Sequence, residues 1–217
     1  LSSVFCLLSV SGMFTNLTNL LKYRPLIQSL VARELKARYR GSVLGFFWSF
    51  INPLLLLLIY SFVFSIVLPN RAPDLEPYAL FMFTGILPWT WFSASVLESS
   101  NILISGGNLI KKVLFPAEVL PIVSVLANMV HFFLGLPILI AFLFYYQHPP
   151  GFLDLLWFPV VVLVQLLFTL GLALIVSALT VHFRDVKDIL SNLITFWFFA
   201  TPIIYPMSMA DDSKLKV

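Results

Sequence analysis

The chain has 217 residues, of which 60% are hydrophobic and only 11% are charged, and its mean hydropathy is +0.98. This composition excludes an ordinary soluble domain and places the protein in the membrane class. The single cysteine, Cys6, excludes a disulfide framework and a metal site built on cysteines.

The N-terminal part of the chain predicts a leader and then an interfacial helix. Residues 1–12 precede Met13 and have no basic residue before their apolar part, so we expect an extraneous leader rather than a secretory signal. Residues 13–42 are expected to form a cytoplasmic or interfacial segment. Pro25 is placed to start an amphipathic helix over Leu26–Arg40, with apolar residues at four-residue spacing and basic residues on another face. Such a helix should lie in the inner interface, either as an anchor or as a contact to a gate or partner.

Five long apolar runs follow, and none of them contains Lys, Arg, Asp or Glu. They have 19 to 28 residues, near or above the ~20 residues that a helix needs to cross a bilayer, and they are too long for barrel strands. We therefore predict an all-α integral membrane domain over residues 43–207, with five transmembrane helices and a short external tail at 208–217. The runs are Val43–Leu68, Tyr78–Leu97, Val119–Tyr146, Leu155–Val181 and Ile189–Met207.

The net charge is +3, and the distribution of the basic residues along the chain predicts membrane topology rather than a nucleic-acid partner. If the N-terminus is cytoplasmic, ten of the thirteen basic residues face inward and three outward, as the positive-inside rule requires. The outward three are Arg71, Lys214 and Lys216. No basic residue lies between the third and fourth runs.

Two cytoplasmic loops have residues that could contact another protein. After Gly106-Gly107, the residues Asn108, Leu109, Ile110, Lys111, Lys112, Val113, Leu114 and Phe115 allow two helical turns before Pro116. Apolar residues in a loop of this length need a cover, either lipid head groups or a groove on a cytosolic protein. The next cytoplasmic segment, around Arg184 and Asp185, is short and zwitterionic, and a simple connecting turn would explain it.

The fifth run contains two prolines and an aromatic cluster towards its outer end. Pro202 and Pro206 each remove a backbone donor, so the helix should kink or break there. Broken backbone at membrane depth must be covered by protein or line a cavity, which favours a pathway over a plain anchor. The residues that we assign to a pathway or gate are Trp89, Trp91, Trp197, Pro202, Tyr205 and Pro206, with packing as the competing role for the tryptophans.

Ionisable groups within or beside the runs are few. Glu98 follows the second run, and His131 lies near the middle of the third, three residues after Asn128. An intramembrane ionisable group is a functional hypothesis by default, although a neutral His bonded to a neighbouring helix is the simpler interpretation. The chain has no zinc-protease motif, no nucleophile elbow and no nucleotide-binding P-loop. We therefore expect no enzyme here, and any ATP must be bound by another chain.

Several short stretches, taken in order, resemble one known family. The resemblance is to the permease subunit of type-2 ABC exporters that move lipid-linked polysaccharides, namely O-antigen, capsule and teichoic-acid precursors. It covers residues from about 14 to 207. The stretches are Arg33–Lys36, Arg38–Gly45 with Trp48, Asn52–Leu54, Gly85–Trp89, Asn108–Pro116, Glu118–Pro121, Phe183–Asp185 and Thr201–Pro206.

The resemblance implies specific partners and roles. It implies a bacterial cytoplasmic-membrane protein in which two permease copies pair with two ATPase subunits. ATP and Mg²⁺ would bind the ATPase, and this chain would hold no cofactor. Asn108–Phe115 would be a coupling helix on the ATPase, with Arg184 and Asp185 in a smaller contact. The substrate would be a polyprenyl-pyrophosphate-linked glycan, and the basic residues that would favour its anionic head group at the entrance are Arg33, Lys36, Arg38 and Arg40.

The family pattern has six spanning helices, and this sequence contains the first five. We therefore expect either a fragment or a truncated gene. Other functions remain open: a type-2 exporter of drugs or other lipids shares the architecture. An integral-membrane transferase acting on polyprenyl carriers would need acidic clusters on one side to hold Mg²⁺. A purely structural anchor would not need the broken fifth helix.

Overall fold

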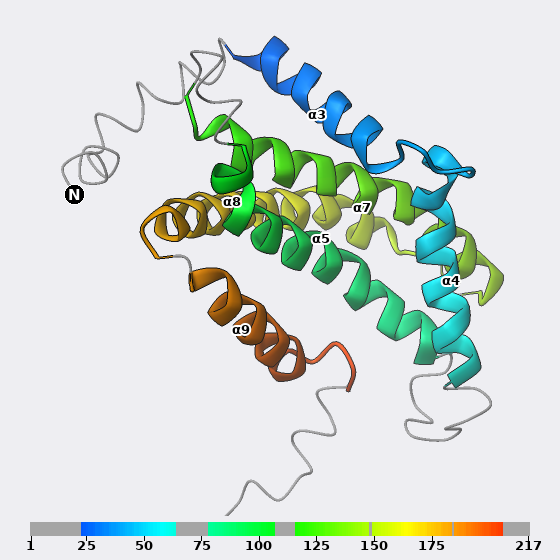
Figure 1. Ribbon diagram of the computed structural model, residues 1–217. Helices are drawn as coiled ribbons and strands as arrows, with labels where there is room; N and C mark the ends of the chain where they lie inside the picture. Colours follow the sequence, from blue (N-terminus) through cyan, green and yellow to red (C-terminus); the bar gives the residue numbers. More distant parts are fainter. Residues whose placement is uncertain (1–22, 64–77, 107–115, 148, 184, 206–217) are drawn as a thin grey trace, which may run out of the picture.

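A computed structural model describes residues 23–63, 78–106, 116–147, 149–183 and 185–205 of the chain (Figure 1). Within these ranges the protein is helical and contains no strand, so the predicted all-α class is confirmed. The leader at 1–12 and the tail at 208–217 lie outside the described residues. The helices are α3 (Arg24–Arg38), the 3₁₀ turn η1 (Gly45–Phe47), α4 (Trp48–Phe62), α5 (Tyr78–Ser105), α7 (Val119–Tyr145), α8 (Phe152–His182) and α9 (Val186–Ala200).

Four helical segments are long and apolar enough to cross a membrane. They correspond to the first four predicted spans. The segments α5, α7 and α8 have 28, 27 and 31 residues, while η1 and α4 together supply 18. The second span continues eight residues past its predicted end at Leu97, because the polar stretch after Leu97 carries on the helix to Ser105.

The fifth predicted span is shorter than expected. Helix α9 has only 15 residues and therefore falls below the ~20 that a perpendicular crossing needs. It ends at Ala200, and Thr201 is extended with ψ of 136°, as the residue before a proline prefers. The break predicted at Pro202 is thus confirmed, while Pro206 lies outside the described residues. The described residues contain four candidate spans instead of five.

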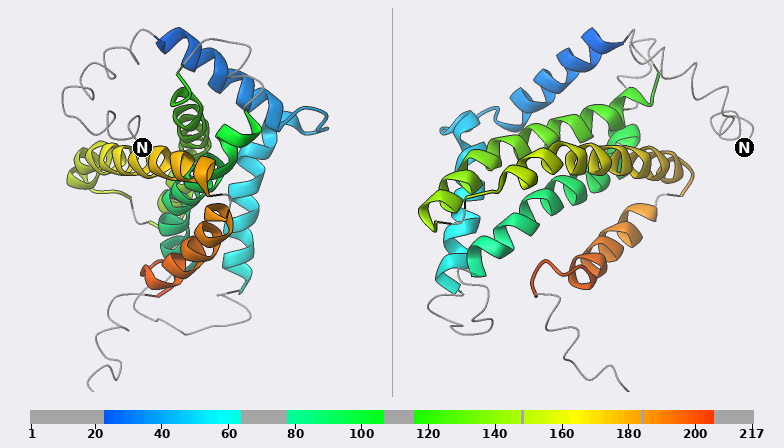
Figure 2. Two further views of the ribbon diagram at one scale, coloured as in Figure 1. Left: turned by 60° about the vertical axis from the view of Figure 1, so that its left-hand side comes forward. Right: turned by 180° about the vertical axis from the view of Figure 1, so that it is seen from behind.

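Helix α5 is the centre of the bundle. It contacts α4, α7, α8 and α9, and α8 crosses α5 and α7 at a steep angle in the left view of Figure 2. In the most apolar 18-residue stretch of α5, half of the residues are buried within the protein. In the first span, Gly45–Phe62, only 11% of the residues are buried. The apolar side chains that α4 and α8 leave exposed are those that a lipid environment would cover.

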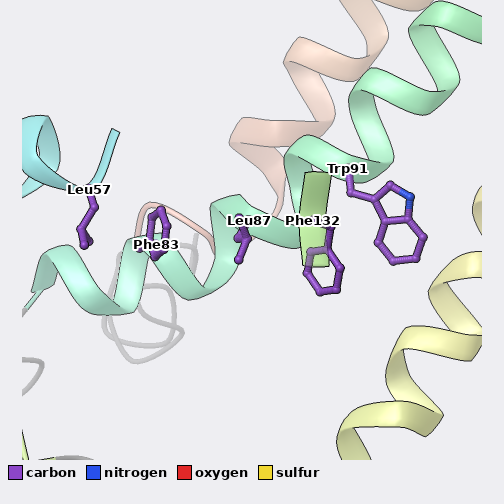
Figure 3. Packing of buried hydrophobic residues seen from close by; sticks show 5 residues of the cluster. All are labelled: Leu57, Phe83, Leu87, Trp91 and Phe132. Atoms are coloured by element: carbon purple, nitrogen blue, oxygen red, sulfur yellow. The ribbon is translucent and has the colours of Figure 1, made fainter. Parts of the chain in front are cut away.

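The main apolar core joins α4, α5 and α7 (Figure 3). Phe83, Leu87 and Trp91 recur every four residues and so lie along one face of α5. Leu57 of α4 and Phe132 of α7 pack against that face. All five side chains are at most 6% exposed.

Helix α3 has its apolar face on α7 rather than free in the interface. Leu30 is buried against Val119 and Val123, in the first turns of α7. Both figures show α3 lying lengthwise beside α7 (Figures 1 and 2). Beyond α3 the chain turns towards α4 through Gly41 and Gly45, whose φ values of +81° and +50° favour glycine.

Close packing between α5 and α7 depends on the absence of a side chain at Gly135, so a larger residue there should destabilise the protein. A Cβ added at Gly135 would lie 2.5 Å from Cδ1 of Leu87, whereas one added at Gly171 of α8 would meet nothing within 4 Å. We expect Gly135→Val to lower the free energy of unfolding by about 1–3 kcal/mol, because the core is overpacked. Gly171→Ala is the control and should be neutral or slightly stabilising. Thermal unfolding in detergent would measure both, and equal midpoints would contradict the packing described.

Candidate functional site

A network of polar side chains lies where α3, α5 and α7 meet. Arg38, in the last turn of α3, directs its guanidinium into this junction. Its Nη2 donates to Oε2 of Glu98 at 2.6 Å, and its Nη1 donates to Oδ1 of Asn128 at 2.9 Å. The two bonds join α3 to α5 and to α7 through one planar, permanently charged group.

The Glu98 carboxylate is held from several sides. Its Oε2 accepts hydrogen bonds from Nδ2 of Asn128 at 2.8 Å and from Oγ of Ser124 at 2.9 Å, in addition to the bond from Arg38. Ser124 and Asn128 are 1% and 4% exposed, so neither could find water as a substitute partner. Three donors therefore converge on one carboxylate oxygen, and they come from three different side chains.

A second set of contacts carries the network to the start of α4. The hydroxyl of Tyr39 shares a hydrogen bond with Oγ of the buried Ser49 and lies 3.3 Å from Nδ1 of His131. The Tyr39 and His131 rings also meet edge to face, with centroids 5.9 Å apart. Among the described residues, the buried Nε2 of His131 has no hydrogen-bond partner.

A cavity of about 460 Å³ lies beside this network, between α3, α4, α5 and α7. Arg38, Asn52, Asn128 and His131 supply polar groups to its wall, and apolar side chains such as Leu87 and Phe132 supply the rest. Because Glu98 compensates the charge of Arg38, the wall offers hydrogen bonds without a net positive charge. Within the described ranges, no group of three or more His, Cys, Asp or Glu is placed to hold a metal ion.

The sequence singled out most of these residues but not their association. It treated Arg38 as one of four entrance cations, and it considered Glu98 and His131 separately. Ser124, Tyr39 and Ser49 were missed. One signal was available: Ser124, Asn128 and His131 follow one another at spacings of four and three, which marks a polar stripe on an otherwise apolar helix.

The other entrance cations have a different environment. Arg33, Lys36 and Arg40 are exposed, whereas Arg38 is half-buried on the opposite face of the same segment. Glu34, four residues before Arg38, also approaches it at 3.9 Å. The structure therefore separates three solvent-facing cations from one that is bound within the protein.

Two of the three tryptophans assigned to a pathway, Trp89 and Trp91, lie on different faces of α5, and the third, Trp197, lies in α9. Trp89 contacts Trp197 of α9 with ring centroids 6.3 Å apart, and Trp197 is 38% exposed. Trp91 points into the core, where it stacks on Phe132 at 5.1 Å and donates from Nε1 to the Val125 carbonyl. At 2% exposure Trp91 has a packing role in this structure.

The remaining predicted residues fall at the ends of helices or outside the described ranges. Ile203, between Pro202 and Tyr205, is buried against Met82 and Ile86 of α5, so the segment after α9 folds back onto the bundle. Asp185 is exposed and immediately precedes α9. Arg184 and the predicted coupling segment 108–115 lie outside the described residues, the latter between the end of α5 and the start of α7.

Comparison with known proteins shows what the chain is similar to. The family model described as ABC-2 type transporter matches residues 25–214. An O-antigen export system permease protein RfbA from Myxococcus xanthus is 47% identical over 197 residues, which cover 91% of this chain and 74% of that protein. Two proteins of the same name from Klebsiella pneumoniae are 38% and 36% identical over 188 residues, covering 86% of this chain and 71% of each.

The Arg38–Glu98 network predicts a specific pattern of stability changes. Glu98→Ala leaves the guanidinium, Ser124 and Asn128 without their shared acceptor, so the free energy of unfolding should fall by about 1–3 kcal/mol. Arg38→Ala/Glu98→Ala should be less damaging than the sum of the single changes, by about 0.5–2 kcal/mol, because neither charge is then left alone. Unfolding in mixed micelles would measure the cycle. Strict additivity would show that the two side chains do not interact.

Proposed function

The chain belongs to the ABC-2 type transporter family, and on this premise we propose that it exports polyprenyl-linked polysaccharide, of the O-antigen, capsule or teichoic-acid type, across the cytoplasmic membrane. It is a multi-pass membrane protein and a transport subunit rather than an enzyme, since ATP hydrolysis in this family falls to a separate ABC ATPase. The observation that carries the substrate class is the 47% identity, over 91% of the chain, to a permease named for O-antigen export. The similar proteins found are all named for O-antigen export, and none is named for drug export.

The mechanism we infer is mechanical and begins at the segment 108–115. This segment connects α5 to α7, which are long continuous helices that pack against each other. Helix α5 has 28 residues and is therefore ~42 Å long, so a displacement of the end next to this segment moves the whole helix. ATP-driven closure of two partner ATPase subunits displaces the segment, with Arg184 and Asp185 as a smaller contact. ATP and Mg²⁺ stay on the partner.

The assembly is a dimer of permeases, with the route for the glycan between them. Support comes from the apolar residues that α4 and α9 leave exposed, such as Leu55, Ile59, Phe196 and Phe199. Such surfaces are suited to lipid or to a second copy of the chain. Trp89 and Trp197, which form one aromatic surface between α5 and α9, remain our candidates for a lining role.

The entrance for the anionic head group is formed by Arg33, Lys36 and Arg40. These three cations are exposed and free to attract a pyrophosphate, whereas the charge of Arg38 is compensated by Glu98. The same face also suits the acidic lipids of the inner leaflet. This arrangement requires the N-terminus to be cytoplasmic.

Charge reversal in the coupling segment tests the partnership with the ATPase. We expect Lys111→Glu/Leu114→Asp to abolish co-purification of the ATPase and to stop surface display of the glycan, because a buried charge would oppose helix-in-groove docking. The measurement is a pull-down with quantification of lipid-linked glycan on each side of the membrane.

A matched control lies in the loop predicted to be external. Arg71→Glu/Leu75→Asp makes an equivalent charge reversal and the same Leu→Asp exchange, and it should leave both association and export unchanged. Undiminished ATPase binding by the Lys111/Leu114 variant would contradict the coupling role. Wild-type protein that binds the ATPase but exports a lipid without glycan would contradict the substrate class.

The topology makes a separate prediction. Cysteines at Lys111 and Lys187 should be protected from a membrane-impermeant maleimide in intact cells, and a cysteine at Arg71 should be labelled, because basic loops stay in the cytosol. Cys6→Ser provides the background, and permeabilised cells provide the positive control. Labelling of Lys111→Cys from outside would reverse the orientation and remove the basis for the coupling segment.

A further inference from the structure

We propose that Arg38 is a positioning residue for transport, which clamps α3 to α5 and α7 so that the three helices move as one body when the segment between α5 and α7 is displaced. This inference rests on the proposed function, since it concerns how ATP-driven movement reaches the entrance. It differs from a gate in which α3 swings independently of its neighbours.

Two attachments hold α3, one along its first half and one in its last turn. Leu30, at the middle of the helix, is buried against Val119 and Val123 of α7, and Leu26 and Ile27, nearer the start, pack against the same cluster. In its last turn, Arg38 bonds to Glu98 of α5 and Asn128 of α7. Leu30 and Arg38 are eight positions apart, or ~12 Å along the helix, so the attachments fix its direction as well as its position.

The polar attachment is directional. The guanidinium is a rigid fork whose two bonded nitrogens are committed to two different helices, and Glu98 is in turn held by Ser124 and Asn128. A lysine could place a charge here but could not reproduce both bonds in one plane. If α3 rotated or slid along α7, the fork would lose at least one acceptor. The buried amide of Asn128 would then lose its bond to the cation.

Both attachments lie next to the segment that the ATPase is proposed to move. Glu98 is seven residues, or about two turns, before Ser105 at the end of α5. Val119 and Val123 form the first turns of α7, on the other side of residues 107–115. The contacts of α3 described above are therefore made to α5 and α7, the two helices that flank this segment. The exposed cations of α3 are carried with them.

The contact continues from Tyr39 to the first turn of α4. Its hydroxyl bonds to Ser49, and its ring meets His131. Displacement of the α5–α7 pair thus reaches the entrance cations and the start of the first span through bonded side chains. Without Arg38, ATP hydrolysis would continue while the entrance no longer followed it.

The first experiment measures glycan exported per ATP hydrolysed, in the complete complex of this permease with its ATPase. We expect Arg38→Ala to lower this ratio by roughly tenfold while ATPase binding and hydrolysis stay within about twofold of wild type. Arg38→Lys should retain an intermediate ratio. Arg24→Ala, which removes the same charge from an exposed position on the same helix, is the matched control and should leave the ratio unchanged.

The second experiment asks directly whether α3 moves against α7, and it uses wild-type Arg38. In a Cys6→Ser background, Leu30→Cys and Val123→Cys are oxidised to a disulfide, with each single cysteine as control. If the helices move as one body, the cross-linked complex exports at a rate within about twofold of its reduced form. The same cross-link should also recover much of the ratio lost in Arg38→Ala.

The outcomes separate this inference from the function on which it depends. An unchanged ratio in Arg38→Ala, or arrest of export by the cross-link, would overturn the clamp while leaving the exporter intact. Wild-type complex that hydrolyses ATP without exporting glycan would instead overturn the proposed function. If Arg38→Ala does not assemble, the cross-linked protein with native Arg38 still decides between joint and independent movement.

Discussion

Arg38 and Glu98 are charged side chains that are only partly open to their surroundings, with 25% and 40% of each side chain exposed, so each needs a partner within the protein. The structure of this protein depends on that constraint at the junction of α3, α5 and α7. Arg38 and Glu98 neutralise each other. The buried Ser124 and Asn128 donate further hydrogen bonds to Glu98, and Asn128 also accepts one from Arg38. Because the two partners belong to different helices, the electrostatic requirement becomes a geometric one. It fixes where a basic N-terminal helix can lie on the bundle.

The same constraint applies to the backbone, and prolines show how it is met. Each candidate span has a proline in its interior, namely Pro53 of α4, Pro88 of α5, Pro137 of α7 and Pro159 of α8. Membrane helices tolerate such prolines where neighbouring groups bond the local carbonyls. At Pro88 of α5, Nε2 of Gln165 in α8 donates to the carbonyl of the proline itself at 2.8 Å, which ties the two helices together at this position. Pro202 is different, because the chain there leaves the helix and packs Ile203 onto α5.

These features explain how one bundle can be both rigid and a transport subunit. In the proposed mechanism, the long helices at the centre carry movement from the segment between α5 and α7, and the α3 attachments carry it to the proposed entrance. The apolar surfaces that remain exposed on α4, α8 and α9 lie at the periphery of the described bundle, where they leave room for lipid and for a second copy of the chain.

The amino-acid sequence by itself determined the all-α membrane class, the first four spans, the break before Pro202 and the family, because uncharged stretch length, proline chemistry and ordered motifs are local properties. It also separated basic from apolar positions on the first helix. It did not reveal that α9 would be only 15 residues long or that Trp91 would stack on Phe132 of α7. Only the tertiary structure decided that Arg38 belongs with Glu98, 60 residues away, and with Asn128, 90 residues away. Positions so distant become neighbours through helix packing alone, and no local pattern encodes which helix the apolar face of α3 will meet.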